Sequence, residues 1–587
     1  MKKLGSIGIG IIIAALAGAA LRLPRLAQRP MHVDEAVHAV KLGKLLEKGE
    51  YVYDPDEYHG PSLYYFTLPV AWAQGVHKYP NLTEPILRVA PAAFGIGLIL
   101  LIFLFRQGLD PAAATIGAIL AALSPALVYY SRYFIQEILL VFFTYLTLAA
   151  GWRYYRSRKI GWALLAGLGI GLMHATKETD FIAYGCFIIA AVFTRLVSRN
   201  SNIKILNSKQ SSQIRPNQAE SSQNKEEKRV QQFGDSLDSS PERAEGFSRG
   251  RQPPEVVKNF QALQGRKGAS PSSKPLLHII FGLSVALLTS ILLFSAFGHN
   301  LRGPLDSILT YGHYFQRAGS NGIHDHPWWF YLRMLTCSHD RSGPLWSEGL
   351  IFGLAVAGFV IALLKKTYDR GDLALVRFVG FFTFLSLLVY SAIPYKTPWC
   401  MLTSLFGMTL LAGFAAVEII NALRPAPLQF LAFGLLLLGM YNLGQQASRS
   451  IGRFAADQRN PYVYAHTSGD LLHIPERAAQ IALFDSAGQK MLIQVISPTD
   501  DFWPLPWYLR QFPNVGYWQE IPPNPDASII IASADIQDLV AARLKDKYFM
   551  EIRGLRPHVK LAVFIKKDLW VQFIEIQKIL AAEGQTR

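Results

Sequence analysis

The chain has 587 residues, of which 51% are hydrophobic and 17% are charged. Soluble proteins carry about 25% charged residues, so this composition excludes an ordinary soluble enzyme and indicates a membrane protein. The formal net charge is +16, and much of it lies in one hydrophilic segment, which fits membrane orientation better than nucleic-acid binding. The three cysteines, Cys186, Cys337 and Cys400, are far apart and show no metal or redox spacing.

About eleven apolar runs are long enough to cross a membrane as helices, each of which needs about 20 residues. The first run, 4–21, follows Lys2 and Lys3 and is longer than the apolar core of a signal peptide. We therefore interpret it as an uncleaved helix with a cytoplasmic N-terminus. The other runs lie at 86–105, 112–130, 133–150, 160–175, 180–197, 276–297, 347–364, 374–393, 399–422 and 427–444.

The connecting loops predict which end of the bundle faces the cytoplasm. Alternate loops are rich in Lys and Arg, as the positive-inside rule requires of cytoplasmic loops. These basic loops lie around Arg106, at 153–159, 198–274 and 365–372, and at Arg424. The loops on the other side, which we place outside, are 22–85, 131–132, 176–179, 298–346 and 394–398, together with everything after 445.

The first outside loop carries the sequence His-Val-Asp-Glu-Ala-Val-His at 32–38, which places two carboxylates between two histidines. The apolar residues that follow have helical spacing, so Asp34 is expected at the N-cap or in the first turn of a surface helix. Capping alone explains one acid but not both. Glu35 and His38 match half of a di-metal helix motif, but no second half follows, which disfavours a dedicated di-metal site.

Two further segments are predicted between the spans. The stretch 61–75 is apolar but short and contains Pro69, so we interpret it as an interfacial or re-entrant helix. The segment 198–274 has little apolar periodicity and is predicted to be a disordered cytoplasmic loop. Contact between this basic loop and anionic lipid stays an alternative.

Other polar groups of the outside loops converge on the same membrane leaflet. Each alone is explained by snorkelling at a helix end, but together, beside a carboxylate pair, they predict a site for an anionic phosphate head group. A carboxylate held near the bilayer is a suitable base for a transfer to a hydroxyl. The residues of this set are Arg132, Lys177, Glu178, His324, His326 and Lys396. Two histidines are weak support for a metal, so none is assigned, and a divalent cation stays an open alternative.

The tail, 449–587, is predicted to be a small α/β domain outside the membrane. Short buried strands are expected at 490–497, 527–533 and 559–567, and amphipathic helices at 535–548 and 568–582. No Gly-rich phosphate motif accompanies them. The aromatic and Pro-rich stretch 500–525 is either a carbohydrate-stacking surface or packing between the domain and the bilayer, and we favour packing.

Several motifs resemble those of the GT-C membrane glycosyltransferases, which include family 39, the protein O-mannosyltransferases, and the aminoarabinose transferases. The closest similarity is to the flippase activity-associated, glycosyltransferase-like family. The resemblance covers the chain except 198–274. The motifs are HVDEAVHA (32–39), HGPSLYYF (59–66), SRYFIQE (131–137), KETD (177–180), PYKTPW (394–399), NPYVYAHTS (460–468) and PWYLR (506–510).

The resemblance implies a function and a set of roles. Asp34 corresponds to the first-loop acid of GT-C enzymes, the catalytic base, and Glu35 to its helper. His59 stands in the amphipathic-helix motif, in which Gly60 replaces the first proline of the usual Pro-Pro pair, so the second surface helix is expected to enter at a different angle. Arg132, Lys177, Glu178 and Lys396 become candidates for donor-phosphate or acceptor contacts.

The implied reaction is an inverting transfer of a hexosyl or pentosyl group from a polyprenyl-phosphate donor to an extracytoplasmic hydroxyl. The acceptor is a glycan, a lipid or a protein of the cell envelope. The main alternative is a non-catalytic partner of a flippase that binds the lipid-linked sugar. A transporter is disfavoured because no inverted repeat or broken helix pair is present.

This interpretation divides the chain into four parts. Residues 1–197 carry helices one to six with the loop 22–85 and form the catalytic module. The basic loop 198–274 follows, then helices seven to eleven at 275–448 with the outside loop 298–346. The α/β domain 449–587 completes the chain.

Overall fold

The computed structural model describes residues 2–55, 59–199, 274–317, 324–340 and 342–585. Within this part of the chain, seven apolar helices are long enough to cross a membrane. They are α4 with its 3₁₀ extension (Glu84–Phe105), α7 (Glu137–Ser157), the helix Asp180–Arg199, α11 (Lys274–Phe294), α15 (Leu373–Ala392), α16 with its 3₁₀ start (Pro398–Ala422) and α17 (Ala426–Ile451). The protein is therefore a polytopic helical membrane protein, as its composition indicates.

Four shorter apolar helices occupy the remaining predicted runs. They are α1 (Lys2–Arg22), α5 (Pro111–Leu123), α8 (Ile160–His174) and α14 (Gly349–Leu364). Two boundaries differ from the prediction. The run 112–130 is split, because Ser124 ends α5 and caps the short helix α6 (Pro125–Tyr130). The run 133–150 becomes helical only at Glu137, after a turn at 131–136.

The helix α16 forms the centre of the bundle and is buried over almost its whole length. It packs against α14, α5 and α15. Small residues permit the closest approach: a Cβ at Gly413 would stand 2.2 Å from the carbonyl oxygen of Ala113 on α5. Membrane helices associate mainly through such close backbone contact, because lipid removes the hydrophobic drive.

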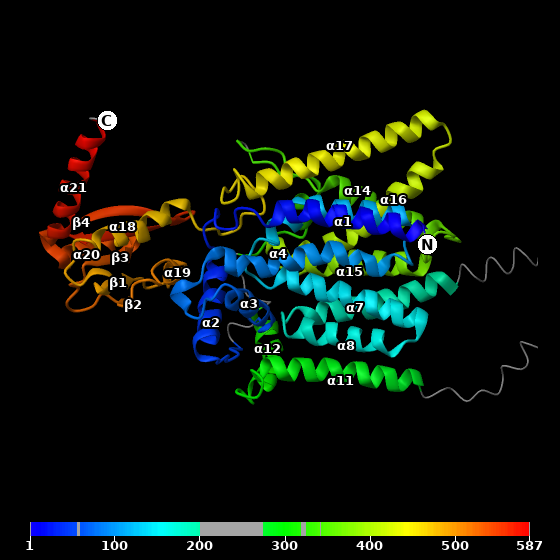
Figure 1. Ribbon diagram of the computed structural model, residues 1–587, viewed down its shortest axis with the longest axis horizontal. Coiled ribbons are helices and arrows are strands. Elements are labelled where there is room, and N and C mark those ends of the chain that lie inside the picture. The colour runs from blue at the N-terminus through cyan, green and yellow to red at the C-terminus, as the bar shows by residue number, and fades with distance from the viewer. Residues whose placement is uncertain (1, 56–58, 200–273, 318–323, 341, 586–587) are drawn as a thin grey trace, which may run out of the picture.

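Three helices lie at one end of the bundle, away from the N-terminus (Figure 1). They are α2 (Val33–Lys48), α3 (Ser62–Ala73) and α12 (Gly303–Arg317). The helix α2 runs across the direction of the long helices and ends at Gly49, whose φ of 68° is the left-handed conformation that glycine adopts without strain. The segment after Asp34 and the stretch 61–75 are thus helical, as expected, and Pro69 lies inside α3.

The tail forms a five-stranded mixed sheet with the order β2-β1-β3-β5-β4. The strands are β1 (Ile493–Ile496), β2 (Val515–Trp518), β3 (Ile529–Ser533), β4 (Tyr548–Arg556) and β5 (Val559–Lys566), and β1 pairs in parallel with β2 and β3. The helices are α18 (His473–Ile481), α19 (Leu505–Tyr508), α20 (Gln537–Leu544) and α21 (Lys567–Gln585). The three predicted strands are confirmed. The predicted helix 535–548 is shorter, because Tyr548 already begins β4.

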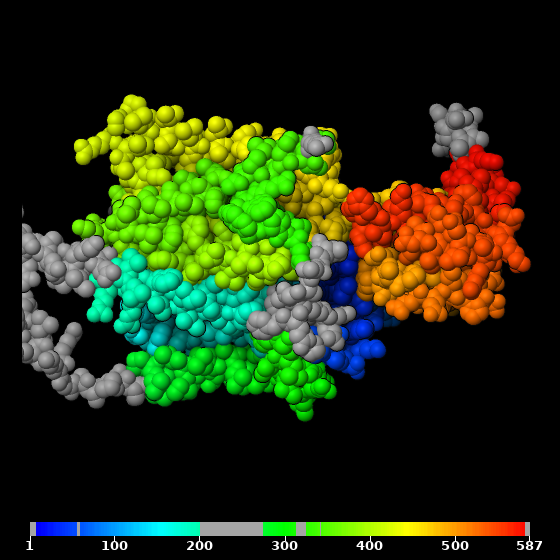
Figure 2. Space-filling model, turned by 180° about the vertical axis from the view of Figure 1, so that it is seen from behind, coloured from blue at the N-terminus to red at the C-terminus, as the bar shows by residue number. Residues whose placement is uncertain are grey.

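This sheet region projects beyond the end of the bundle, and α2 lies between the two (Figures 1 and 2). The stretch 500–525 makes the contact. The Trp507 Nε1–H donates to Glu84 Oε1 at 2.9 Å, and the Tyr508 hydroxyl accepts from the Met31 N–H at 2.8 Å. These aromatics therefore pack against the first loop, while their predicted place between the domain and the bilayer stays a prediction. The predicted disorder of 198–274 concerns residues that, apart from the ends of two helices, lie outside the described ranges.

Candidate active site

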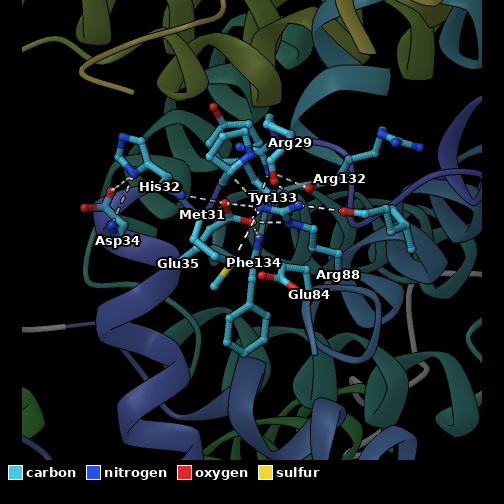
Figure 3. Close-up of polar contacts among 12 residues, drawn as sticks. Arg29, Met31, His32, Asp34, Glu35, Glu84, Arg88, Arg132, Tyr133 and Phe134 are labelled. Atoms are coloured by element: carbon cyan, nitrogen blue, oxygen red, sulfur yellow. Dashed lines mark hydrogen bonds and ion pairs between the residues drawn. The ribbon is translucent and has the colours of Figure 1, made fainter. Parts of the chain in front are cut away.

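The first turn of α2 directs its two neighbouring acids in opposite directions (Figure 3). His32 is the N-cap: its Nδ1 accepts from the Asp34 N–H at 3.1 Å, and Glu35 Oε2 accepts from the His32 N–H at 2.9 Å. This reciprocal capping box fixes the start of the helix. The Asp34 side chain stays 43% exposed, with Oδ2 3.7 Å from His32 Nδ1. Glu35 is completely buried.

Glu35 is held by two arginines and two backbone amides. Arg88 donates from Nε to Oε1 and from Nη2 to Oε2, both at 2.8 Å, and Arg29 Nη2 donates to Oε1 at 3.1 Å. The Phe134 N–H adds a bond of 2.9 Å to Oε1. Burial opposes the charge, but Arg29 and Arg88 outweigh it and hold the pKa of Glu35 well below its usual range. The buried carboxylate thus ties α2 to α4 and to the turn at 131–136.

Three histidines and a tyrosine form a polar group at the start of α2, beside the exposed acid. The Tyr464 hydroxyl lies 2.6 Å from His324 Nδ1 and 3.3 Å from His326 Nε2, and its backbone carbonyl lies 3.0 Å from His32 Nε2. Burial lowers the pKa of His324, and the nearby charge of Asp34 opposes this shift. The predicted residue His324 thus lies near Asp34, and the predicted residue His326 shares the Tyr464 hydroxyl with it.

A second polar group lies one turn further along α2. The His38 ring lies 5.8 Å from that of His59, whose Nδ1 is 2.9 Å from Glu178 Oε2. Lys177 donates to Glu137 Oε1, and both side chains are buried. Burial lowers the pKa of His38, and the neighbouring His59 and Lys41 add to this, so the buried imidazole is held neutral. The sequence-predicted His59, Lys177 and Glu178 therefore lie together.

Gly60 makes this arrangement fit. Its N–H donates to the Thr176 carbonyl at 3.0 Å, and a Cβ at this position would stand 2.2 Å from the Ala175 carbonyl oxygen. A proline here would lack the N–H and would clash with that backbone. Gly60 therefore permits the close approach to the backbone of Ala175 and Thr176, and the expected change in the entry angle of α3 stays a prediction.

A Gly60→Ala variant is expected to lose about 1–3 kcal/mol of unfolding free energy, because the new methyl group must displace backbone atoms. Thermal unfolding in detergent measures this loss. Gly469→Ala is the matched control, since no atom stands within 4 Å of a Cβ there. Equal unfolding of Gly60→Ala and wild type would show that the two loops are not in this close contact.

Arg132 and Lys396 are engaged by backbone carbonyls. Arg132 donates to the carbonyls of Arg22, Pro24 and Arg25 at 2.7–3.0 Å, which caps the C-terminus of α1. Lys396 Nζ donates to the carbonyls of His326 at 2.8 Å and of Ile393 at 2.5 Å. The donors of both cations therefore hold the chain itself, and their contact with a phosphate stays a prediction.

No group of three or more His, Cys, Asp or Glu in the described ranges is placed to hold a metal ion. The residues that sequence reasoning missed are Arg29, Arg88 and Tyr464. Tyr464 could have been found, because it lies in the motif 460–468. Nothing in the sequence marked the two arginines: Arg88 lies 53 residues from Glu35, and Arg29 lies outside every motif.

Known proteins are similar to this chain in fold and, over part of its length, in sequence. Residues 59–211 match the family described as dolichyl-phosphate-mannose-protein mannosyltransferase. None of the curated proteins matches the chain in sequence. The structure of ArnT from Cupriavidus metallidurans bound to undecaprenyl phosphate is similar, with 14% identity, a TM-score of 0.58, and coverage of 95% of this chain and 98% of that one. Its apo structure gives 14% identity, a TM-score of 0.56, and coverage of 97% and 99%.

The apo oligosaccharyltransferase from Archaeoglobus fulgidus has 12% identity and a TM-score of 0.52, with coverage of 90% of this chain and 70% of that one. These likenesses show the GT-C fold. Over residues 59–211 the chain is thus similar to the dolichyl-phosphate-mannose-protein mannosyltransferases.

Proposed function

We propose that this protein transfers a sugar from a polyprenyl phosphate to an acceptor hydroxyl outside the cytoplasm, with Asp34 as the base. The observation that carries the proposal is the contrast between two adjacent acids. Glu35 is buried and fully bonded, whereas Asp34 is 43% exposed among His32, His324 and Tyr464. A carboxylate that is fixed by a helix start and still open to a substrate meets the geometric need of a general base.

The proposed reaction is a single displacement. Asp34 takes the proton of the acceptor hydroxyl, whose oxygen attacks the anomeric carbon. The bond from that carbon to the phosphate oxygen breaks, and the polyprenyl phosphate leaves with the bonding electrons. One displacement inverts the anomeric configuration. Glu35 acts as a positioning residue, because both its oxygens are held by Arg29, Arg88 and backbone amides.

Lys177 is the cation that we assign to the leaving phosphate. Its ammonium bonds to Glu137 and retains further N–H groups, and His59 and Glu178 lie beside it. A preorganised cation at the developing charge is worth several kcal/mol in a dry site. Arg132 and Lys396 support the site by capping backbone carbonyls. His324 and His326 line the acceptor side.

The proposed orientation of the protein in the membrane rests on the segments that lie at each end of the bundle. The helices α2, α3 and α12 and the tail sheet lie at one end, and the N-terminus lies at the other (Figure 1). With basic loops on the N-terminal side, we place this side in the cytoplasm and the site outside, with eleven spans in the plasma or inner membrane.

Donor turnover in proteoliposomes tests the function. The protein is supplied with polyprenyl-phosphate sugars and glycan, lipid or peptide acceptors, with and without a chelator. The expected result is acceptor-dependent release of polyprenyl phosphate and a glycosylated acceptor with inverted anomeric configuration. Donor binding without release would overturn the proposal and favour the alternative, a lipid-linked-sugar binding partner of a flippase as in the flippase-associated family.

A Tyr464→Phe variant is expected to transfer roughly ten times more slowly, because the hydroxyl shared by His324 and His326 is lost. The free energy of unfolding should change by only about 1 kcal/mol. Steady-state transfer and thermal unfolding measure the two effects. Tyr441→Phe, at a residue that is 66% exposed, is the matched control. Unchanged transfer by Tyr464→Phe would remove these histidines from the site.

A further inference from the structure

Four arginines are buried at the end of α1, behind Glu35. Arg22 and Arg88 are 1% exposed, Arg29 is 6% and Arg132 is 7% exposed. Glu35 is the one carboxylate among the described residues that bonds to any of them. Carbonyls receive many of the donors: Arg22 bonds to Ala121 and Ala122, and Arg132 to the end of α1. Carbonyl dipoles satisfy hydrogen bonds but leave the formal charge of the group positive.

A small cavity opens among three of these arginines. Its lining residues are Leu26, Arg29, Arg88, Tyr129, Arg132, Ile451 and Ala455. It has space for about one water-sized group. It lies on the side of Glu35 away from Asp34, because Arg88 and Arg132 lie opposite Asp34 and His32 (Figure 3).

Arg29, which lines this cavity, carries an unused donor. Its Nη2 bonds to Glu35 and to the Arg132 carbonyl, but its buried Nη1 has no hydrogen-bond partner among the residues that the structure describes. Its guanidinium lies 3.4 Å from the centre of the Tyr133 ring, which holds it in place. A buried donor without a partner costs about 1–3 kcal/mol, so a ligand at Nη1 is favoured.

We propose that this cavity binds a small monovalent anion of halide size, held by Arg29, Arg88 and Arg132. Every charged group on its wall is cationic, which favours an anion over a neutral water molecule. Burial and the charges of Arg29 and Arg88 lower the pKa of Arg132 to about 10, as expected of a cation that faces other cations. The space excludes a lipid phosphate or pyrophosphate, so the site is separate from that of the sugar donor.

The bound anion stabilises the turn that presents Asp34. Arg88 also donates to the carbonyls of Leu26, Arg29 and Pro30. These bonds fix the backbone that leads to His32. An anion that relieves the repulsion among the arginines therefore stabilises the folded protein. Binding to the folded state alone raises the unfolding temperature in proportion to the logarithm of anion concentration above its dissociation constant.

Thermal unfolding of the full chain in a neutral detergent tests the proposal. Sodium gluconate is replaced stepwise by chloride or bromide at pH 7 and constant ionic strength, and tryptophan fluorescence reports unfolding. We expect a rise of several degrees with chloride and with bromide. No difference from gluconate, or a larger rise with inorganic phosphate than with chloride, would overturn the halide site.

Two variants locate the effect. Leu26→Phe fills the cavity without removing a charge, and Arg29→Gln removes the unused donor. Both should abolish the difference between chloride and gluconate. Leu23→Phe, at a neighbouring leucine that is 44% exposed, is the matched control and should retain it. A full chloride effect in Leu26→Phe would place the anion elsewhere. If a variant does not fold, the wild-type titration alone decides, because it needs no substitution.

Discussion

A Glu35→Gln variant is expected to lose about 3–5 kcal/mol of unfolding free energy. Removing the charge leaves Arg29 and Arg88 buried without their carboxylate, and breaking one partner of a buried ion pair has this cost. The amide also turns one acceptor into a donor that faces arginine donors. Thermal or denaturant unfolding in detergent measures the loss. Glu50→Gln, an exposed acid just after α2, is the matched control and should unfold like wild type.

The lowered pKa of Glu35 also predicts that the free energy of unfolding falls in acid. The pKa of Glu35 in the folded protein lies well below its usual value of about 4.3, so its contribution is present above pH 4.3. This contribution is lost as the pH falls from there toward the lower folded-state pKa. The Gln variant should lack this part of the acid destabilisation. If Glu35→Gln had the wild-type free energy of unfolding at neutral pH, Glu35 would not stabilise the fold through its ion pairs with Arg29 and Arg88.

An Asp34→Asn variant is expected to lose sugar transfer by roughly 10²–10⁴-fold, the usual contribution of a positioned general base. Asparagine keeps the size of the side chain but does not accept a proton at neutral pH. The cap of α2 should survive, because it is made by the Asp34 backbone N–H and by Glu35. The unfolding temperature should therefore stay near that of wild type. Initial rates of product formation at saturating donor measure the loss.

Two controls separate a catalytic loss from a binding loss. Glu50→Gln makes the same acid-to-amide change on the same loop and should transfer at the wild-type rate. Donor affinity of Asp34→Asn should be unchanged, because the assigned phosphate contact is Lys177. Full transfer by Asp34→Asn would move the base to another residue. Loss of donor binding with the loss of transfer would make Asp34 a donor contact.

Patterns along the chain predicted the membrane helices and the surface helix α2 well. Apolar composition determines where a chain enters lipid, and the apolar spacing after Asp34 indicated a helix that starts near it. Asp34 lies in the first turn, as one of the two expected positions, but His32 is the N-cap. The strands β1, β3 and β5 were found because each is a continuous apolar run, as buried strands are.

The partners of Glu35 could not be predicted, because they depend on the packing of distant segments. Arg88 lies 53 residues away on α4, and Phe134 lies 99 residues away in a turn. The same holds for Arg132, whose position in a loop suggested phosphate but whose neighbours are the carbonyls that end α1. The strands β2 and β4 were missed because their side chains alternate between buried and exposed or are only partly buried.

The most direct measurement is single-turnover release of polyprenyl phosphate from a labelled donor, with wild type and Asp34→Asn compared at equal donor occupancy. We predict acceptor-dependent release by wild type, and release slowed by at least about a hundredfold in Asp34→Asn, with the donor still bound. Equal release by the two proteins, or no release by wild type with any acceptor while the donor stays bound, would contradict the account.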